Sequence, residues 1–187
     1  SFAGKTVGDK VAKPSSTLSG TGFLVRKNIV LTNRHVVEEI AKWHTTYGDH
    51  DLWYLEFAYP RQNGGWSTTL KRITNIFAFV DPKGGMDAGL VEFNRRDEES
   101  GFNYCVPVQF GDLSQIVIGA DVGVCGYPLG DELLVHGQGF WRSGPVVHAG
   151  MISGIAPFDT KNPRDITAFL TDLNSAPGMS GSPLFTP

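Results

Sequence analysis

The sequence has few cysteines, few charged residues and no long hydrophobic run. Cys105 and Cys125 are the only cysteines among 187 residues, which excludes a small secreted domain built on several disulfides. The longest unbroken apolar run covers only residues 76–80, whereas a helix needs about 20 such residues to span a membrane, so we expect no membrane span. Charged residues make up 19%, the formal net charge is −3, and Lys and Arg form no block. Nucleic acid is therefore not expected as the main partner.

The two cysteines lie in apolar, strand-like surroundings, so buried free thiols and one disulfide both remain open. Neither has the Cys or His neighbours of a zinc site, and no metal is expected. Because the chain begins at Ser1, the lack of a leader peptide says nothing about the compartment. The small number of cysteines leans toward an intracellular or bacterial setting rather than a disulfide-rich secreted enzyme.

What the sequence has instead is turn material between short strand-like runs. It contains 23 Gly and 11 Pro, and its runs rich in Val, Ile, Phe, Trp and Thr predict strands. The predicted strands cover residues 22–25, 28–32, 52–59, 67–80, 88–93, 106–110, 121–126, 146–155 and 166–173. A short helix is predicted after His35, because five residues there share one helical face: Val36, Val37, Ile40, Ala41 and Trp43.

This pattern predicts an all-β chain built as barrels or as a sandwich. The most charged stretch, residues 94–101, is typical of a solvated connector. We therefore expect a loosely held lead-in at 1–16, a first half at 17–93, a connector at 94–104 and a second half at 105–187.

Three segments carry residues that could do chemistry. Ser180 stands in Gly178-Met179-Ser180-Gly181, where glycines permit a tight turn that presents the serine Oγ and backbone N–H groups together. His35 follows an apolar strand, and Asp87 opens another. Taken singly, each has an ordinary structural explanation, since Gly-Ser clusters and strand-opening aspartates are common in turns.

Taken together, the three segments resemble the chymotrypsin-like serine peptidases. His35, Asp87 and Ser180 occur in that family's order, separated by 52 and 93 residues. The finer resemblance is to the HtrA/Deg-type branch of trypsin-like peptidases, and it rests on five segments: 19–25 (SGTGFLV), 32–37 (TNRHVV), 126–130 (GYPLG), 150–154 (GMISG) and 171–183 (TDLNSAPGMSGSP).

The resemblance implies two antiparallel β-barrels with a catalytic site at their seam, and a protein or peptide substrate. Ser180 would attack the scissile carbonyl, His35 would take its proton, and Asp87 would orient the imidazole. The N–H groups of Gly178 and Ser180 would form the oxyanion hole. Asn174 would lie at the floor of the specificity pocket, and no cofactor would be needed.

The sequence also departs from the relatives that it resembles. Met179 replaces the aspartate that pairs with a new N-terminus in zymogen-activated trypsins, and Val36 replaces a disulfide cysteine. Asn174 is uncharged, which disfavours a preference for Arg or Lys before the cut. Residues 132–145 form an enlarged loop that could be either a lid or a surface insertion. Residues 1–187 contain no PDZ domain, although many HtrA proteins carry one.

Several alternatives stay open at this stage. The chain could be a catalytically inactive trypsin-like module that binds peptides or protein partners, or an unrelated β-sandwich with chance motifs. Asp81 is the other acid near Asp87, but it lies in a turn. The layouts of α/β-hydrolases and subtilisins do not fit, because no His follows Ser180 and no Asp in a strand context precedes His35. Since the nucleophile is followed by further strands in the resembling family, we expect a fragment, with more strands, domains or subunits beyond Pro187.

Overall fold

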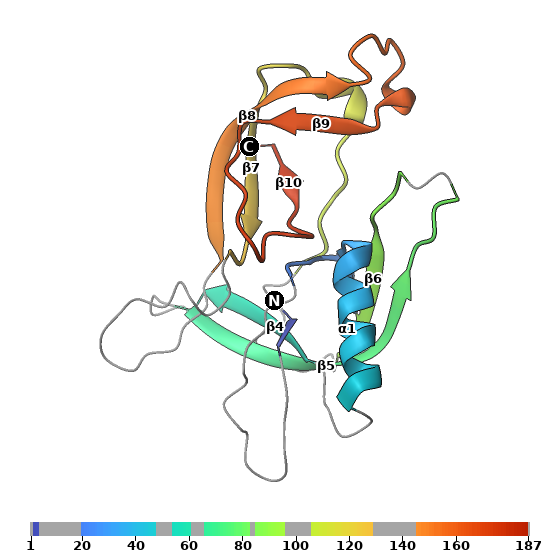
Figure 1. Ribbon diagram of the computed structural model, residues 1–187. Helices are drawn as coiled ribbons and strands as arrows, with labels where there is room; N and C mark the ends of the chain where they lie inside the picture. Colours follow the sequence, from blue (N-terminus) through green and yellow to red (C-terminus); the bar gives the residue numbers. More distant parts are fainter. Residues whose placement is uncertain are drawn as a thin grey trace.

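The structure is a computed structural model, and it describes residues 2–3, 20–47, 54–60, 66–82, 85–95, 106–128 and 145–186. These residues form two antiparallel sheets and one α-helix (Figure 1). The first sheet has the strand order β1-β4-β5-β6-β3-β2, with β1 (Phe2–Ala3), β2 (Phe23–Arg26), β3 (Ile29–Thr32), β4 (Tyr54–Pro60), β5 (Trp66–Ala78) and β6 (Gly89–Phe93). The second has the order β10-β7-β8-β9, with β7 (Asp121–Gly126), β8 (Val146–Ala156), β9 (Ala168–Thr171) and β10 (Leu184–Phe185). The helix α1 is Arg34–Tyr47, and two 3-10 turns, η2 (Leu113–Gln115) and η4 (Pro163–Asp165), lie in the second half.

One long strand curves each sheet by changing its pairing partner. In β5, residues 66–72 pair with β4 and residues 73–78 pair with β6. In β8, residues 146–151 pair with β7, and the pairing then moves to β9. Both changes of partner coincide with a register irregularity, which bends a strand and increases its twist. The two sheets therefore curl, as the strands of a barrel do.

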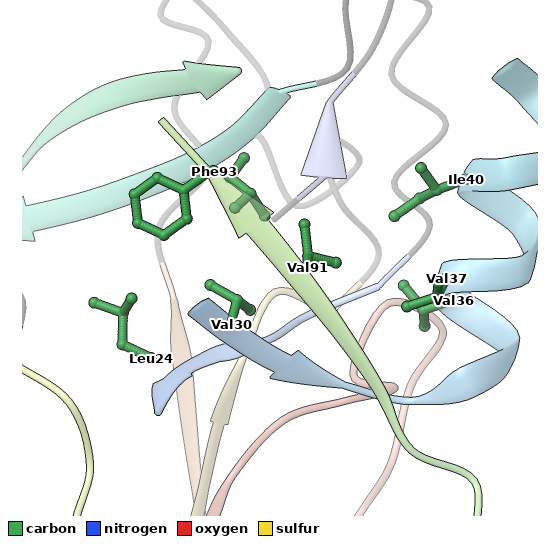
Figure 2. Packing of buried hydrophobic residues seen from close by; sticks show 8 residues of the cluster. Leu24, Val30, Val36, Val37, Ile40, Val91 and Phe93 are labelled. Atoms are coloured by element: carbon green, nitrogen blue, oxygen red, sulfur yellow. The ribbon is translucent and has the colours of Figure 1, made fainter. Parts of the chain in front are cut away.

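The main core lies between the first sheet and α1. Figure 2 shows Val36, Val37 and Ile40 of α1 near Val91 of β6. Among the described residues, the buried cluster consists of Leu24, Val30, Val36, Val37, Ile40, Leu55, Val91 and Phe93. The Phe93 ring also packs against Phe57, with ring centroids 5.1 Å apart. Fully burying one such aliphatic side chain contributes about 1.5–3 kcal/mol, so this cluster fixes α1 on the sheet.

The predicted fold class is confirmed, and eight of the nine predicted strands coincide with β2 to β9 within a few residues. The remaining prediction, a strand at residues 106–110, is wrong. This segment runs beside β2 and donates one hydrogen bond, from Val108 N to Leu24 O at 2.8 Å, but it forms no ladder. Pro107 has no N–H to donate, which removes one of the hydrogen bonds that a strand would need.

Two other differences concern the ends of the chain. Phe2–Ala3, predicted as part of a loose lead-in, pairs with β4, and the rest of residues 1–16 lies outside the described residues. β10, which the sequence did not predict, pairs with β7. The predicted loop at 132–145 lies outside the described residues except for Pro145, and Cys105 and the Trp43 side chain lie outside them as well.

Cys125 carries a free, half-buried thiol, and burial raises the pKa of that thiol. Within the part of the chain that the structure describes, no helix is both long and apolar enough to cross a membrane.

Candidate active site

His35 and Asp87 lie close together because the end of β3 is beside the start of β6 in the first sheet. β3 and β6 are antiparallel, and Thr32 at the end of β3 pairs with Gly89 at the start of β6. The residue that enters α1 after β3 therefore lies beside the residue that precedes β6. His35 Nδ1 is 2.7 Å from Asp87 Oδ2, and the backbone N–H of His35 donates to Asp87 Oδ1 at 3.1 Å.

The Asp87 carboxylate also caps α1. The first turn of α1 contains no acidic residue, and the side chain of Asn33, just before the helix, donates from Nδ2 to Asp87 O at 3.0 Å. The first N–H groups of a helix lack partners within the helix and attract negative charge. Asp87 supplies that charge from another segment of the chain.

The environment of Asp87 favours its ionised form. Partial desolvation raises the pKa of this carboxyl. The hydrogen bonds from the His35 ring and backbone, the charge of His35 and the backbone N–H of Arg34 outweigh that effect, and the pKa lies below its ordinary value of 3.8. Both side chains face solvent, with 53% of His35 and 44% of Asp87 exposed.

Asp81, the other acid near Asp87, is used by its own turn. Its Oδ2 accepts hydrogen bonds from Gly85 N at 2.8 Å and from Met86 N at 3.0 Å. Asp81 thus orders the backbone immediately before Asp87, and no hydrogen bond or ion pair joins it to His35 among the described residues.

Ser180 is the second residue of the second of two consecutive tight turns. Met179 N donates to Ala176 O at 3.1 Å, and Ser182 N donates to Met179 O at 3.0 Å. The third residue of each turn is a glycine with positive φ, +90° at Gly178 and +84° at Gly181, which is typical of type II turns. Met179 is only 7% exposed, so its side chain anchors this loop in the interior.

The structure does not bring Ser180 into hydrogen bonding with His35. Among the described residues, no hydrogen bond joins Ser180 Oγ to the imidazole, and the N–H groups of Gly178 and Ser180 donate to no protein acceptor. Asn174 is exposed. An apolar cavity of about 430 Å³ lies over the second sheet and includes Ser182 in its lining, but not Ser180 or His35. No group of His, Cys, Asp and Glu in the described ranges could hold a metal ion.

Comparison with known proteins identifies the family. The family described as the trypsin-like peptidase domain matches residues 20–187. The chain belongs to this family. Its membership excludes the unrelated β-sandwich considered above. Comparison with curated protein sequences gives no match.

Solved structures of HtrA/Deg proteases share the fold of this trypsin-like peptidase domain. The crystal structure of Deg5 superimposes with a TM-score of 0.56 at 19% identity and covers 89% of this chain and 68% of Deg5. The HtrA-type protease AlgW with a decapeptide superimposes with a TM-score of 0.53 at 17% identity and covers 100% of this chain. The chain spans 50% of AlgW. These likenesses confirm the trypsin-like fold and the resemblance to HtrA proteases.

Two residues of this trypsin-like peptidase domain have contacts in the site that the sequence did not predict. Asn33 holds the backbone of Asp87, and Thr21 contacts the Ser180 loop. Thr21 lies within the segment 19–25 on which the resemblance partly rests, but nothing in that segment indicates which loop it meets.

Proposed function

We propose that this domain is a serine endopeptidase that hydrolyses peptide bonds in protein or peptide substrates. The observation that supports this most strongly is the hydrogen bond between His35 Nδ1 and the Asp87 carboxylate, which is held ionised at the start of α1. A carboxylate at Nδ1 fixes the imidazole tautomer whose Nε2 is free to accept a proton. That arrangement suits a general base rather than a purely structural histidine.

In the proposed reaction, Ser180 Oγ attacks the scissile carbonyl carbon while its proton moves to His35 Nε2. The carbonyl π electrons move to oxygen, and the resulting oxyanion accepts hydrogen bonds from the N–H groups of Gly178 and Ser180, which have no protein acceptor among the described residues. His35 then gives its proton to the leaving amine as the C–N bond breaks. Water gives a proton to His35 as it attacks the acyl carbon, and His35 passes that proton to Ser180 Oγ as the ester C–O bond breaks and the acid product leaves.

The substrate class is part of the same proposal. AlgW has been solved with a decapeptide, and a peptide in extended conformation is the substrate we propose for this domain. Asn174 is proposed to contact the residue before the cut. Its side chain is uncharged, which disfavours Arg and Lys at that position.

A peptide-binding module without activity is the second candidate. The absence of a Ser180 Oγ–His35 hydrogen bond among the described residues favours it. That absence is compatible with activity too, since catalytic hydrogen bonds are often long in unliganded enzymes and tighten with substrate.

Labelling with a fluorophosphonate probe, which reacts with activated serines, tests the proposal. The wild-type domain is expected to be labelled, Ser180→Ala is not, and His35→Ala should lose labelling while keeping its circular dichroism spectrum. Ser182→Ala is the matched control, because Ser182 lies two residues further along the same loop and its Oγ is buried. A folded wild-type protein that takes up no label would contradict the enzyme and favour the binding module.

A further inference from the structure

Thr21 joins the Ser180 loop to the end of β3, after which His35 follows in α1. Its backbone N–H donates to Ser180 O at 2.7 Å, and its hydroxyl donates to Gly178 O at 2.7 Å. Thr21 O accepts from Thr32 Oγ1 at 2.6 Å, and the Thr21 hydroxyl accepts from Tyr127 N at 3.0 Å. Thr21 thus makes two hydrogen bonds to the Ser180 loop, one to the end of β3 and one to the segment after β7.

Thr21 itself lies in the interior, although its partners Gly178, Ser180 and Tyr127 are only partly buried. Thr21 is only 2% exposed and Thr32 only 4%, so water cannot replace a lost partner easily. A hydroxyl has a single proton, and here it goes to Gly178 O while the oxygen accepts from Tyr127 N. Each bond polarises the next, which favours one fixed arrangement of all three groups.

The position of Thr21 relates Ser180 to His35 directly. Thr32, which binds Thr21 O, is the last residue of β3 and lies three residues before His35. Gly20 immediately precedes Thr21. A β-carbon added at Gly20 would lie 2.7 Å from Val36 Cγ2 and 3.0 Å from Ser180 O. The backbone at 20–21 therefore fills the space between the residue after His35 and the residue proposed as nucleophile.

We propose that Thr21 is a positioning residue that sets the Ser180 loop at the right place for His35. This inference rests on the proposed peptidase function. The hydroxyl acts through Gly178, whose carbonyl it holds, and so fixes the peptide plane between Gly178 and Met179. It touches neither substrate nor reacting atoms, and its effect is on where Ser180 and the neighbouring N–H groups lie.

The test compares Thr21→Val with Thr21→Ser. Valine keeps the shape and both backbone hydrogen bonds of residue 21 but leaves Gly178 O and Tyr127 N without the hydroxyl. We expect kcat to fall roughly 10- to 100-fold with KM within about twofold, because small displacements of reacting groups have effects of that size. Serine keeps the hydroxyl and should restore most of kcat. Leu55→Val, in the buried core on β4, is the control for lost stability alone and should leave kcat unchanged.

A second readout separates this inference from the peptidase proposal. Hydrogen exchange at the amides of residues 178–182 should be faster in Thr21→Val than in Thr21→Ser or Leu55→Val, whether or not the domain turns over substrate. If exchange in the loop is unchanged, or if valine keeps the wild-type kcat, the positioning role is wrong. If wild-type protein neither cleaves nor labels, the peptidase proposal fails and the catalytic role of Thr21 falls with it, while accelerated exchange would still show that Thr21 holds the loop.

Discussion

At the scale of single residues, the Asp87 carboxylate combines a structural contact with a chemical one. One oxygen accepts from the His35 backbone at the start of α1, and the other contacts the His35 ring. The same side chain therefore holds the helix that carries His35 and orients the imidazole of His35. Substitutions at Asp87 have to be chosen so that these two effects can be measured apart.

Asp87→Asn separates the two roles, because an amide oxygen can still accept from the His35 backbone. If the amide NH₂ faces Nδ1, it favours the wrong imidazole tautomer, and we expect kcat/KM to fall by roughly ten-thousandfold with the fold retained. Asp81→Asn is the control, since the Asp81 carboxylate serves its own turn. Near-normal turnover of Asp87→Asn, or an equal loss in Asp81→Asn, would show that the acid is wrongly assigned.

The lowered pKa of Asp87 also predicts a pH dependence of stability. Because the folded state holds this carboxyl ionised below its ordinary pKa of 3.8, the unfolded state binds the proton first as the pH falls. The contribution of Asp87 is present in full above the unfolded pKa and is lost as the pH falls through the lowered folded pKa. Urea unfolding between pH 6 and pH 2 should show a smaller acid loss for Asp87→Asn than for wild type. Parallel curves for the two proteins would contradict the prediction.

At the scale of elements, the sequence predicted what depends on local pattern. The strand predicted at residues 88–93 is β6, with Gly89, Val91 and Phe93 buried. Of the helical face predicted after His35, Val36, Val37 and Ile40 are buried. The segment 106–110 has the composition of a strand but not the pairing, because pairing depends on which backbone lies alongside and on the missing N–H of Pro107.

The candidate site also contains residues that the sequence could predict and one contact that it could not. The order of the motifs was sufficient to select His35, Asp87 and Ser180 as candidates, and the adjacency of β3 and β6 explains why the first two meet. The contact of Thr21 with Gly178 joins residues 157 positions apart. No local pattern encodes such a pair, since it depends on how the two sheets are arranged.

The packing of α1 on β6 leads to a prediction about Gly89. A β-carbon at Gly89 would lie 2.5 Å from Val37 Cγ2 and 3.2 Å from both Asn33 O and Phe77 O, so α1 or β6 must move. Gly89→Ala is expected to lower the free energy of unfolding by about 1–3 kcal/mol and to reduce turnover, because Asp87 lies two residues away. Val37→Ala removes the closest methyl group. The double variant should therefore lose less free energy of unfolding than the two single variants lose in sum. Additive effects in urea unfolding would mean that Val37 is not the obstacle.

At the scale of the whole molecule, the buried apolar side chains are unevenly divided. Among the described residues, the cluster of eight buried apolar side chains belongs to the first sheet and α1, while the buried apolar residues of the second half are Val122, Ile152 and Met179. The second sheet also borders the apolar cavity of about 430 Å³. The Ser180 loop thus belongs to the more thinly packed half and is bonded through Thr21 to the better packed one.

This division predicts that the two sheets open at different free energies. Regions with few buried contacts open locally below the free energy of global unfolding. Native-state hydrogen exchange should therefore give a smaller opening free energy for the paired amides of β7 and β8 than for those of β3 and β6. Val91→Ala provides the matched perturbation, because Val91 is fully buried in the first core and its truncation destabilises only the global unfolding step. It should lower the opening free energy of β3 and β6 while leaving that of β7 and β8 nearly unchanged. The opposite result would be equal opening free energies in both sheets that decrease together in Val91→Ala. The molecule would then unfold as one unit, and the better packed half would give the Ser180 loop no separate support.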